Sequence, residues 1–278
     1  MSRPLLSNAA IKNIAYLTMF IDHFFAVVFM QIIRQRSAAG YETELLQQVY
    51  SVGRAVGRMS FVLFAYLTVE GFLHTKSRKK YLLRLGLFAL VSEIPFDLTF
   101  MGQIIDHNSQ NIFFTLFVSV LVLTVWEWAA ENLRILYRTR AQRDMYWNVC
   151  VGVFRTVQVG AVLLGCSTAH FLRTDYRYMG VLLIFILYIL HDKPWFFKIV
   201  PAACVMLLGM WGINCQRYEG IYTTAYLFRF SMRELYGLFA FVPIAMYSGT
   251  KGKQLPKAVC YGFYPMHLLV LCGIARLV

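Results

Sequence analysis

The 278-residue sequence is poor in charge, because 15% of its residues are charged whereas about 25% are charged in an ordinary soluble domain. Acidic residues are especially scarce: 14 Asp and Glu stand against 27 Lys and Arg, which gives a net charge of +13. This composition excludes a disordered chain and a typical cytosolic enzyme. The sequence also lacks an internal repeat and a Pro-, Gly- or Ser-rich linker, so we predict a single domain over residues 1–278.

Two further classes of site have no support in the sequence. The six cysteines are scattered without a CxxC pair, so we expect small buried side chains rather than a disulfide framework or a zinc site, and no metal. The aromatic residues lie inside apolar blocks instead of alternating with basic residues, so we expect no nucleic-acid partner. The excess of Lys and Arg is typical instead of one face of a membrane.

What the sequence has in abundance is apolar residues, 59% of the total, in blocks near the 20 residues that cross a bilayer core of roughly 30 Å. We therefore predict an all-α, polytopic transmembrane helical bundle with about nine crossings and a range of eight to ten, surrounded by membrane lipid. The first block is too long for a cleavable signal, and the sixth and eighth are short. The predicted spans are 11–33, 56–75, 81–101, 111–131, 148–170, 179–191, 194–213, 234–248 and 257–276.

The distribution of positive charge predicts the sidedness of these spans. The loop 76–80 is the most basic, and two further basic loops follow, whereas the loop 102–110 has no Lys or Arg. With nine crossings, the positive-inside rule places the amino terminus in the cytoplasm and the carboxyl terminus outside. The basic residues of the two further loops are Arg134, Arg138, Arg140 and Arg143, and Lys251, Lys253 and Lys257.

Ionisable residues inside the apolar blocks are the first candidates for function, because such groups usually face a bundle interior or a wet cavity. Lys12 and His23 are 11 residues apart in the first block, which is about three helical turns, so they share one helix face roughly 16 Å apart. His267 lies at a similar depth in the last block. We predict that His23 and His267 meet in one cavity, and that Asp22, which points about 100° away from His23, bonds another helix.

Other polar groups near span ends have both functional and structural interpretations. Glu70 and His74 are four residues apart and suit either a site or a satisfied pair at the membrane interface. Glu93 and Asp97 are also four residues apart, around Pro95, and suit either a site or hydrogen bonding between helices. Arg58 and Arg84 suit either a site or headgroup contacts. We assign no role to His107 and His191, which fall in loops, or to His170 at a span end.

The order and content of these polar motifs resemble the TraX family from about residue 11 to 273. The motifs are Lys12-Asn-Ile-Ala, Met19-Phe-Ile-Asp22-His23, Gly57-Arg58-Met-Ser-Phe61, Glu70-Gly-Phe-Leu-His74-Thr75, Tyr81-Leu-Leu-Arg84-Leu, Ser92-Glu93-Ile-Pro95-Phe-Asp97, Gln110-Asn111-Ile-Phe-Phe-Thr115, Thr174-Asp175-Tyr176 and Tyr261-Gly-Phe-Tyr264-Pro-Met-His267-Leu. Two positions depart from the family pattern: Val62 stands where the family usually has Pro, and Arg177 where it usually has Gly.

The resemblance implies a protein of the bacterial cytoplasmic (inner) membrane that acetylates an acceptor, with the amino terminus of pilin as the family precedent. Lys12, ten residues and His23 also resemble the Arg/Lys-x10-His motif of the wider membrane acyltransferases, in which the histidine is taken as catalytic. We carry that role to His23 and the role of the basic motif residue to Lys12. The acceptor implied is a pilin, a peptide or a sugar. Arg177 places a bulky cation where the family usually has Gly, which would reshape the outer mouth and so change which acceptor fits.

Acyl transfer from a thioester needs a base, stabilisation of an oxyanion and positioning. A neutral imidazole suits the base near pH 7, so we predict His23 as base or acetyl carrier, with His267 and Asp22 in the same catalytic group. His267, Tyr264 or Asn111 would orient His23 or hold the oxyanion. The donor is acetyl-CoA, whose phosphates need cations. The candidates for these cations are Lys12, Arg78, Lys79, Lys80 and Arg84, and the remaining polar candidates, for substrate or structure, are Arg58, Glu70, His74, Glu93, Asp97 and Asp175.

Two other functions remain open at this point. A small-molecule transporter also places polar groups at mid-depth, although we find neither an inverted repeat nor paired broken helices. A non-catalytic assembly factor of a pilus or secretion machine would not need deep histidines.

Overall fold

The computed structural model describes residues 5–139 and 145–278, and these are helical almost throughout. No strand occurs in the described ranges, and their only β pairings are two isolated bridges, Leu6 with Tyr247 and Gln110 with Thr174. The helices run in order as α1 (Asn8–Phe24), η1 (Phe25–Phe29), α2 (Met30–Ala38), α3 (Glu44–Gly57), α4 (Met59–Leu73), α5 (Arg78–Phe100), α6 (Ile112–Thr139), α7 (Met145–Phe171), α8 (Arg177–Ile189), α9 (Trp195–Arg217), α10 (Thr224–Ser231), η2 (Met232–Ala240), α11 (Phe241–Ala245) and α12 (Lys257–Leu277). The all-α prediction is confirmed.

Six helical segments within the described residues are long and apolar enough to cross a membrane, so the count of about nine crossings stays a prediction. Three predicted spans account for the difference. The 23-residue helix α5 carries Arg84, Glu93 and Asp97 along its length, α8 has only 13 residues, and the region 234–248 forms the short helices η2 and α11 instead of one continuous span. The prediction also missed α3, which continues into α4 as one 30-residue helical segment.

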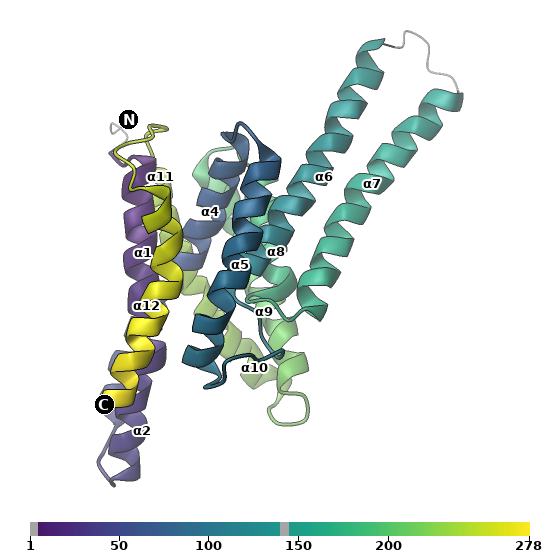
Figure 1. The fold of residues 1–278 in the computed structure, drawn as a ribbon. Coiled ribbons are helices and arrows are strands. Elements are labelled where there is room, and N and C mark those ends of the chain that lie inside the picture. The colour runs from purple at the N-terminus through teal and green to yellow at the C-terminus, as the bar shows by residue number, and fades with distance from the viewer. Residues whose placement is uncertain (1–4, 140–144) are drawn as a thin grey trace.

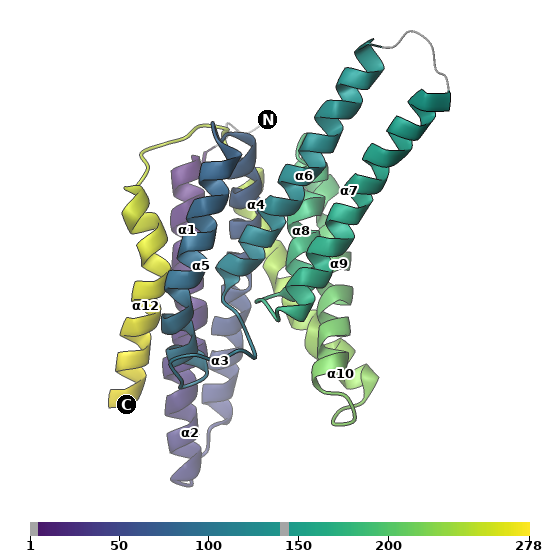
Figure 2. The same ribbon diagram turned by 45° about the vertical axis from the view of Figure 1, so that its right-hand side comes forward.

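The connections between helices gather at two ends of the bundle. The start of α1, the turn between α4 and α5 and the start of α12 lie at one end, which we call the amino end (Figure 1). The α5–α6 and α9–α10 connections, the tip of α2 and the end of α12 lie at the other, which we call the far end (Figure 2). The basic loop 76–80 is therefore at the amino end and the loop 102–110 at the far end, as the charge pattern predicted. Arg140 and Arg143 lie outside the described residues.

The helix α4 occupies the interior of the bundle. Its sequence is apolar on nearly every face, which is typical of a helix that is surrounded by others, and most of its side chains, from Ser60 to Phe72, are buried. It packs against α1, α8 and η2. In contrast, α7 leaves large apolar side chains such as Leu163 and Leu164 exposed, as a lipid-facing helix would, and it pairs with α6 to project past the other helices (Figure 1).

Small residues let α3 approach α1 closely. A Cβ atom on Gly57 would meet Oδ1 of Asp22 at 2.1 Å, and one on Gly53 would meet the ring of Phe25 at 2.2 Å. Because the two glycines are four residues apart, they lie on one face of α3, against α1 and the π-helical turn η1. That turn begins two residues after His23, and such turns are frequent at functional sites.

Candidate functional site

The imidazole rings of His23 on α1 and His267 on α12 are in direct contact. Nδ1 of His23 lies 2.6 Å from Nε2 of His267, and the rings are nearly parallel, with centroids 4.9 Å apart. Tyr264 packs edge-on against both rings, and Phe100 against that of His23. The two histidines are therefore in contact, which is one half of the prediction that they meet in one cavity.

Hydrogen bonding assigns the tautomers of this pair. Nδ1 of His267 lies 2.8 Å from the carbonyl oxygen of Phe263, which can only accept, so this nitrogen carries the proton. In a neutral ring the Nε2 atom of His267 is then an acceptor, and the Nδ1 atom of His23 must donate to it. This assignment leaves the lone pair on Nε2 of His23, an atom for which the described residues provide no hydrogen-bond partner.

A first cavity, of about 540 Å3, leads from the amino end of the bundle to His23, and we call it the Lys12 cavity. Lys12, Lys251 and Gln254 line its outer part, and Nζ of Lys12 donates to Oε1 of Gln254 at 2.7 Å. The segment that carries Lys251 is held over the start of α1 by main-chain bonds, including Ala9 N to Lys251 O at 3.2 Å. Deeper in, the wall is largely apolar and aromatic, with Tyr16, Phe61, Phe64, Phe113 and Tyr264 among its residues.

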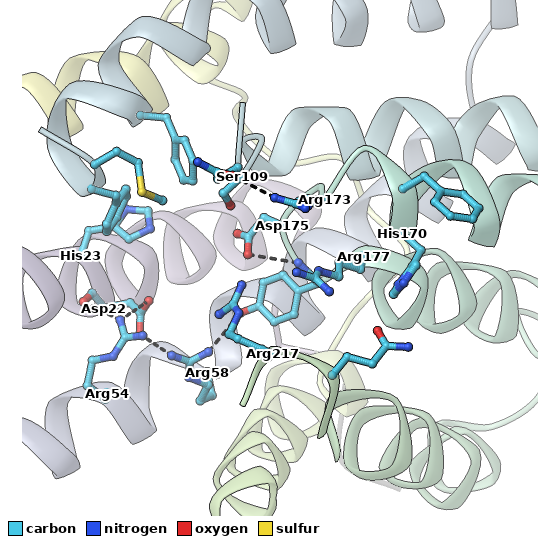
Figure 3. A pocket seen from close by; sticks show the side chains of 17 residues that line it. Asp22, His23, Arg54, Arg58, Ser109, His170, Arg173, Asp175, Arg177 and Arg217 are labelled. Carbon is cyan, nitrogen blue, oxygen red and sulfur yellow. Dashed lines mark hydrogen bonds and ion pairs between the residues drawn. The ribbon is translucent and has the colours of Figure 1, made fainter. Parts of the chain in front are cut away.

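A second cavity, of about 900 Å3, lies toward the far end, and we call it the arginine cavity (Figure 3). Its wall combines residues of α1, α3 and α5, the ends of α7 and α9, the start of α8 and the loops that follow α5 and α7. Five arginines line it, whereas Asp22 and Asp175 are the only carboxylates among its lining residues. The arginines are Arg54, Arg58, Arg173, Arg177 and Arg217.

Four residues line both cavities: Asp22, His23, Asp175 and Tyr176. His23 is therefore reachable from two directions, whereas the described lining residues of neither cavity include His267. The predicted shared site thus takes a different form, in which His23 faces the cavities and His267 supports it from behind.

A network of ion pairs links α1, α3 and η2 at the place where the two cavities meet. Asp22 accepts from Arg54 of α3 at 2.7 Å and lies 3.9 Å from Arg58, which confirms that it bonds another helix. Arg58 is mostly buried and also contacts Glu234 of η2 at 3.2 Å and the hydroxyl of Tyr176 at 3.4 Å. The interpretation of Arg58 as a headgroup contact is therefore wrong, because its charge is neutralised inside the bundle.

Asp175 and Tyr176 sit in a strained turn between α7 and α8. Tyr176 has φ of 60° and Arg177 has φ of 45°, a left-handed conformation that glycine adopts most readily. This explains physically why Gly suits position 177. Two hydrogen bonds fix the main chain of Asp175. Its amide donates to the carbonyl oxygen of Gln110 at 2.8 Å, and the hydroxyl of Thr115 donates to the carbonyl oxygen of Asp175. Burial raises the pKa of the Asp175 carboxyl to about 6.

The other predicted donor cations do not join Lys12. Arg78 is 3.1 Å from Glu131 and 3.9 Å from Glu127, so two carboxylates neutralise it. Lys79 and Lys80 are exposed at the start of α5, and Arg84 lies over the ring of Tyr81 at 5.9 Å. None of the four is among the residues that line the Lys12 cavity. The cation that accompanies Lys12 is Lys251 instead.

Glu70 pairs with a histidine that the sequence analysis set aside. Its carboxylate is buried and lies 2.9 Å from Nε2 of His191 and 3.2 Å from the hydroxyl of Tyr247. His74 is largely exposed, and its Nδ1 bonds the main-chain oxygen of Glu70 at 2.9 Å. The prediction that His191 has no role is therefore wrong, because it helps to tie α4 to the turn between α8 and α9. The Glu70 hydrogen bond raises the pKa of His191.

Glu93, Asp97 and Asn111 serve as structural links near the far end. Asp97 accepts from the amide of Asp106 at 2.8 Å, which anchors the loop 101–111. Glu93 accepts from the amide and the side chain of Asn111, whose own Oδ1 caps the first turn of α6 at the amide of Phe113. All polar atoms of the Asn111 side chain are thus engaged, so Asn111 is not available beside His23.

Several site residues were missed, and only some had a signal. Arg54 could have been found, since it precedes Arg58 by four residues and shares its helix face. Glu234, Arg173 and Arg217 had no such signal, because a short 3-10 helix, a loop and the end of α9 bring them to the site from distant parts of the sequence.

Comparison with known proteins supplies the family. The TraX protein family model matches residues 7–275. The chain belongs to the TraX family. No curated protein and no solved structure matches it. Family membership and the apolar helices together identify a membrane protein of the pilin acetylation family, and the resemblance seen in the motifs is confirmed over almost the whole chain.

Proposed function

We propose that this TraX protein is a membrane acetyltransferase that uses His23 as the general base, with acetyl-CoA in the Lys12 cavity and the acceptor in the arginine cavity. The observation that carries the proposal is the position of His23 on the wall of both cavities. A donor and an acceptor that enter from opposite ends of the bundle would meet at this side chain.

The Lys12 cavity suits the shape and charge of acetyl-CoA. Lys12 and Lys251 at its outer part offer two cations to the CoA phosphates, and the described ion pairs give neither of them a carboxylate partner. The apolar inner wall suits the extended pantetheine arm. Three helical turns separate Lys12 from His23, or roughly 16 Å, a span that such an arm crosses. The amino end would then face the cytoplasm.

The chemistry proposed for His23 is a proton transfer. The acceptor oxygen or nitrogen attacks the thioester carbonyl carbon while Nε2 of His23 takes the proton of the nucleophile. The tetrahedral intermediate collapses, the carbon–sulfur bond breaks, and the CoA thiolate leaves with the proton returned from Nε2. His267 accepts from Nδ1 of His23, so it holds the reactive tautomer and spreads the positive charge that forms. A base in this position contributes about 10²–10⁴-fold to the rate.

Asp22 has a supporting role in this scheme. Its carboxylate is bound to Arg54, so we assign it to holding α3 against α1 rather than to proton transfer. Tyr264, which packs against both histidines, keeps their rings aligned.

A transporter is the second candidate, since two cavities that meet at one side chain also suit alternating access. The two functions differ in their products. An acetyltransferase releases free CoA thiol from acetyl-CoA, whereas a transporter leaves the thioester intact.

The test is thiol release by the purified protein in lipid nanodiscs. We expect His23→Gln, which keeps hydrogen bonding and lacks a usable base, to lower the rate by at least about 10²-fold with unchanged acetyl-CoA affinity. The matched control is His107→Gln, in an exposed loop outside both cavities, which should retain the wild-type rate. Wild-type rates in His23→Gln would contradict the proposal, and an intact thioester in the wild type would favour the transporter.

A further inference from the structure

The arginine cavity holds more positive charge than its surroundings neutralise. Arg54 is paired with Asp22, and Arg58 with Glu234. No ion pair within the described residues involves any of the other three arginines. Arg173 donates to the neutral amide oxygen of Asn108 at 2.8 Å.

These three unpaired arginines converge from different elements. Arg173 lies in the loop after α7, Arg177 begins α8 and Arg217 ends α9, and Arg177 experiences electrostatic repulsion from both of the others. Figure 3 shows their side chains gathered in the space beside Asp175. Like charges held together destabilise the fold unless a counter-charge joins them. Guanidinium groups match phosphate and carboxylate oxygens with two parallel hydrogen bonds each.

We propose that the acceptor carries a phosphate or carboxylate group, which Arg173, Arg177 and Arg217 bind, and that this group directs the acceptor's amine or hydroxyl toward Nε2 of His23. The inference rests on the proposed function, which makes the arginine cavity the acceptor site. An acceptor whose only charge is a protonated amine would be repelled here.

Such an anionic group has two possible sources, a soluble molecule or a lipid headgroup. The structure gives the lipid a route, because Arg54 and Arg58 also line an apolar groove of about 1010 Å3 between α3 and η2. Tyr50, Val52, Phe239 and Val242 contribute its apolar wall. A lipid whose hydrocarbon chain lay in this groove would place its headgroup beside Arg54 and Arg58, at the edge of the arginine cavity.

The experiment measures binding by calorimetry with two probes that share an amine and differ in a phosphate, O-phosphoethanolamine and ethanolamine. Wild-type protein should bind the phosphate-bearing probe at least about tenfold more tightly, since each charge-assisted hydrogen bond contributes that order of affinity. The variant Arg173→Gln/Arg177→Gln/Arg217→Gln should lose this preference. The matched control, Arg34→Gln/Arg36→Gln/Arg276→Gln, removes three exposed cations from the same end of the bundle outside the cavity and should keep it.

The source of the anion is decided by repeating the titration in nanodiscs with and without phosphatidylethanolamine, which has the same headgroup. Weaker binding of the soluble probe in the presence of that lipid assigns the site to a lipid headgroup, and unchanged binding assigns it to a soluble acceptor.

Three results would overturn the inference: equal affinity for both probes, an unchanged preference in the triple variant, or loss of acetyl-CoA affinity in that variant, which would assign the arginines to the donor. His23→Gln separates the two proposals, because it should keep the phosphate preference. If the wild-type protein does not turn over acetyl-CoA, yet its preference for the phosphate-bearing probe is lost in the triple variant, the anion site stands and the acetyltransferase proposal is rejected.

Discussion

Nδ1 of His23 lies 2.6 Å from Nε2 of His267, and the carbonyl of Phe263 fixes the direction of that hydrogen bond. The His267 ring thus accepts the proton on Nδ1 of His23, and His267 is only 6% exposed. This geometry supports the proposed roles, in which His23 contacts the substrates and His267 positions the His23 ring.

This division predicts a graded response at position 267. His267→Ala removes the acceptor for Nδ1 of His23 and should lower kcat by about 10²-fold, whereas His267→Gln, whose amide oxygen still accepts, should lower it by about tenfold. The pH–rate profile should also shift, because the pKa of His23 in the complex depends on this hydrogen bond. Acetyl-CoA affinity should stay at the wild-type value in both variants. Equal rates and profiles in wild type and His267→Ala would contradict a positioning role.

The donor cations give a second prediction. Lys12→Ala should weaken acetyl-CoA binding by about tenfold, in a salt-sensitive manner, because it removes a cation from the outer part of the Lys12 cavity. Lys79→Ala is the control, since Lys79 is exposed at the same end and outside that cavity. Calorimetry on both variants checks this. A larger loss for Lys79→Ala would move the donor phosphates to the basic loop 76–80.

The close contact of α1 with α3 predicts a large effect from one methyl group. Gly57→Ala should destabilise the protein by about 1–3 kcal/mol, because the added Cβ would overlap Oδ1 of Asp22 at 2.1 Å. Gly152→Ala on α7 is the matched control, as its Cβ would meet nothing within 4 Å, and a helical Gly→Ala change there should be neutral or stabilising. Thermal unfolding in nanodiscs compares the two. Equal melting temperatures would show that α3 and α1 separate easily.

The pair of Glu70 and His191 predicts a pH-dependent stability. Because the Glu70 hydrogen bond raises the pKa of His191, its stabilising effect is complete below the unfolded value of about 6.5 and is lost as the pH rises through the raised folded value. His191→Gln keeps a neutral donor to Glu70. We therefore expect it to be less stable than wild type by about 1 kcal/mol near pH 5.5 and nearly equal at alkaline pH. A difference that grows with pH would contradict this sign.

The sequence was sufficient for the parts of this molecule that depend on helical periodicity. The 11-residue spacing of Lys12 and His23 placed both on one face of a single helix, and matched depth brought His267 to the same level. The long apolar blocks likewise predicted the helical segments. These are properties of single helices, which the chain encodes locally.

Properties that depend on packing between distant segments were beyond the sequence. The closer histidine to the Glu70 carboxylate is His191 at 2.9 Å, 121 residues away, whereas His74 on the adjacent turn is 3.8 Å from it. Arg173, Arg177 and Arg217 form a cluster only because the loop after α7, the start of α8 and the end of α9 meet. The region 234–248 was apolar enough for a span, yet it forms η2 and α11, with Glu234 bound to Arg58 inside the bundle.

The most direct measurement of the central claim is a cryo-EM structure of the protein in nanodiscs with a non-hydrolysable acetyl-CoA analogue. The account predicts nucleotide density beside Lys12 and Lys251, a pantetheine arm along the Lys12 cavity, and an acyl carbon within about 3–4 Å of a nucleophile position next to Nε2 of His23. Nucleotide density in the arginine cavity, or an acyl group directed away from His23, would contradict it.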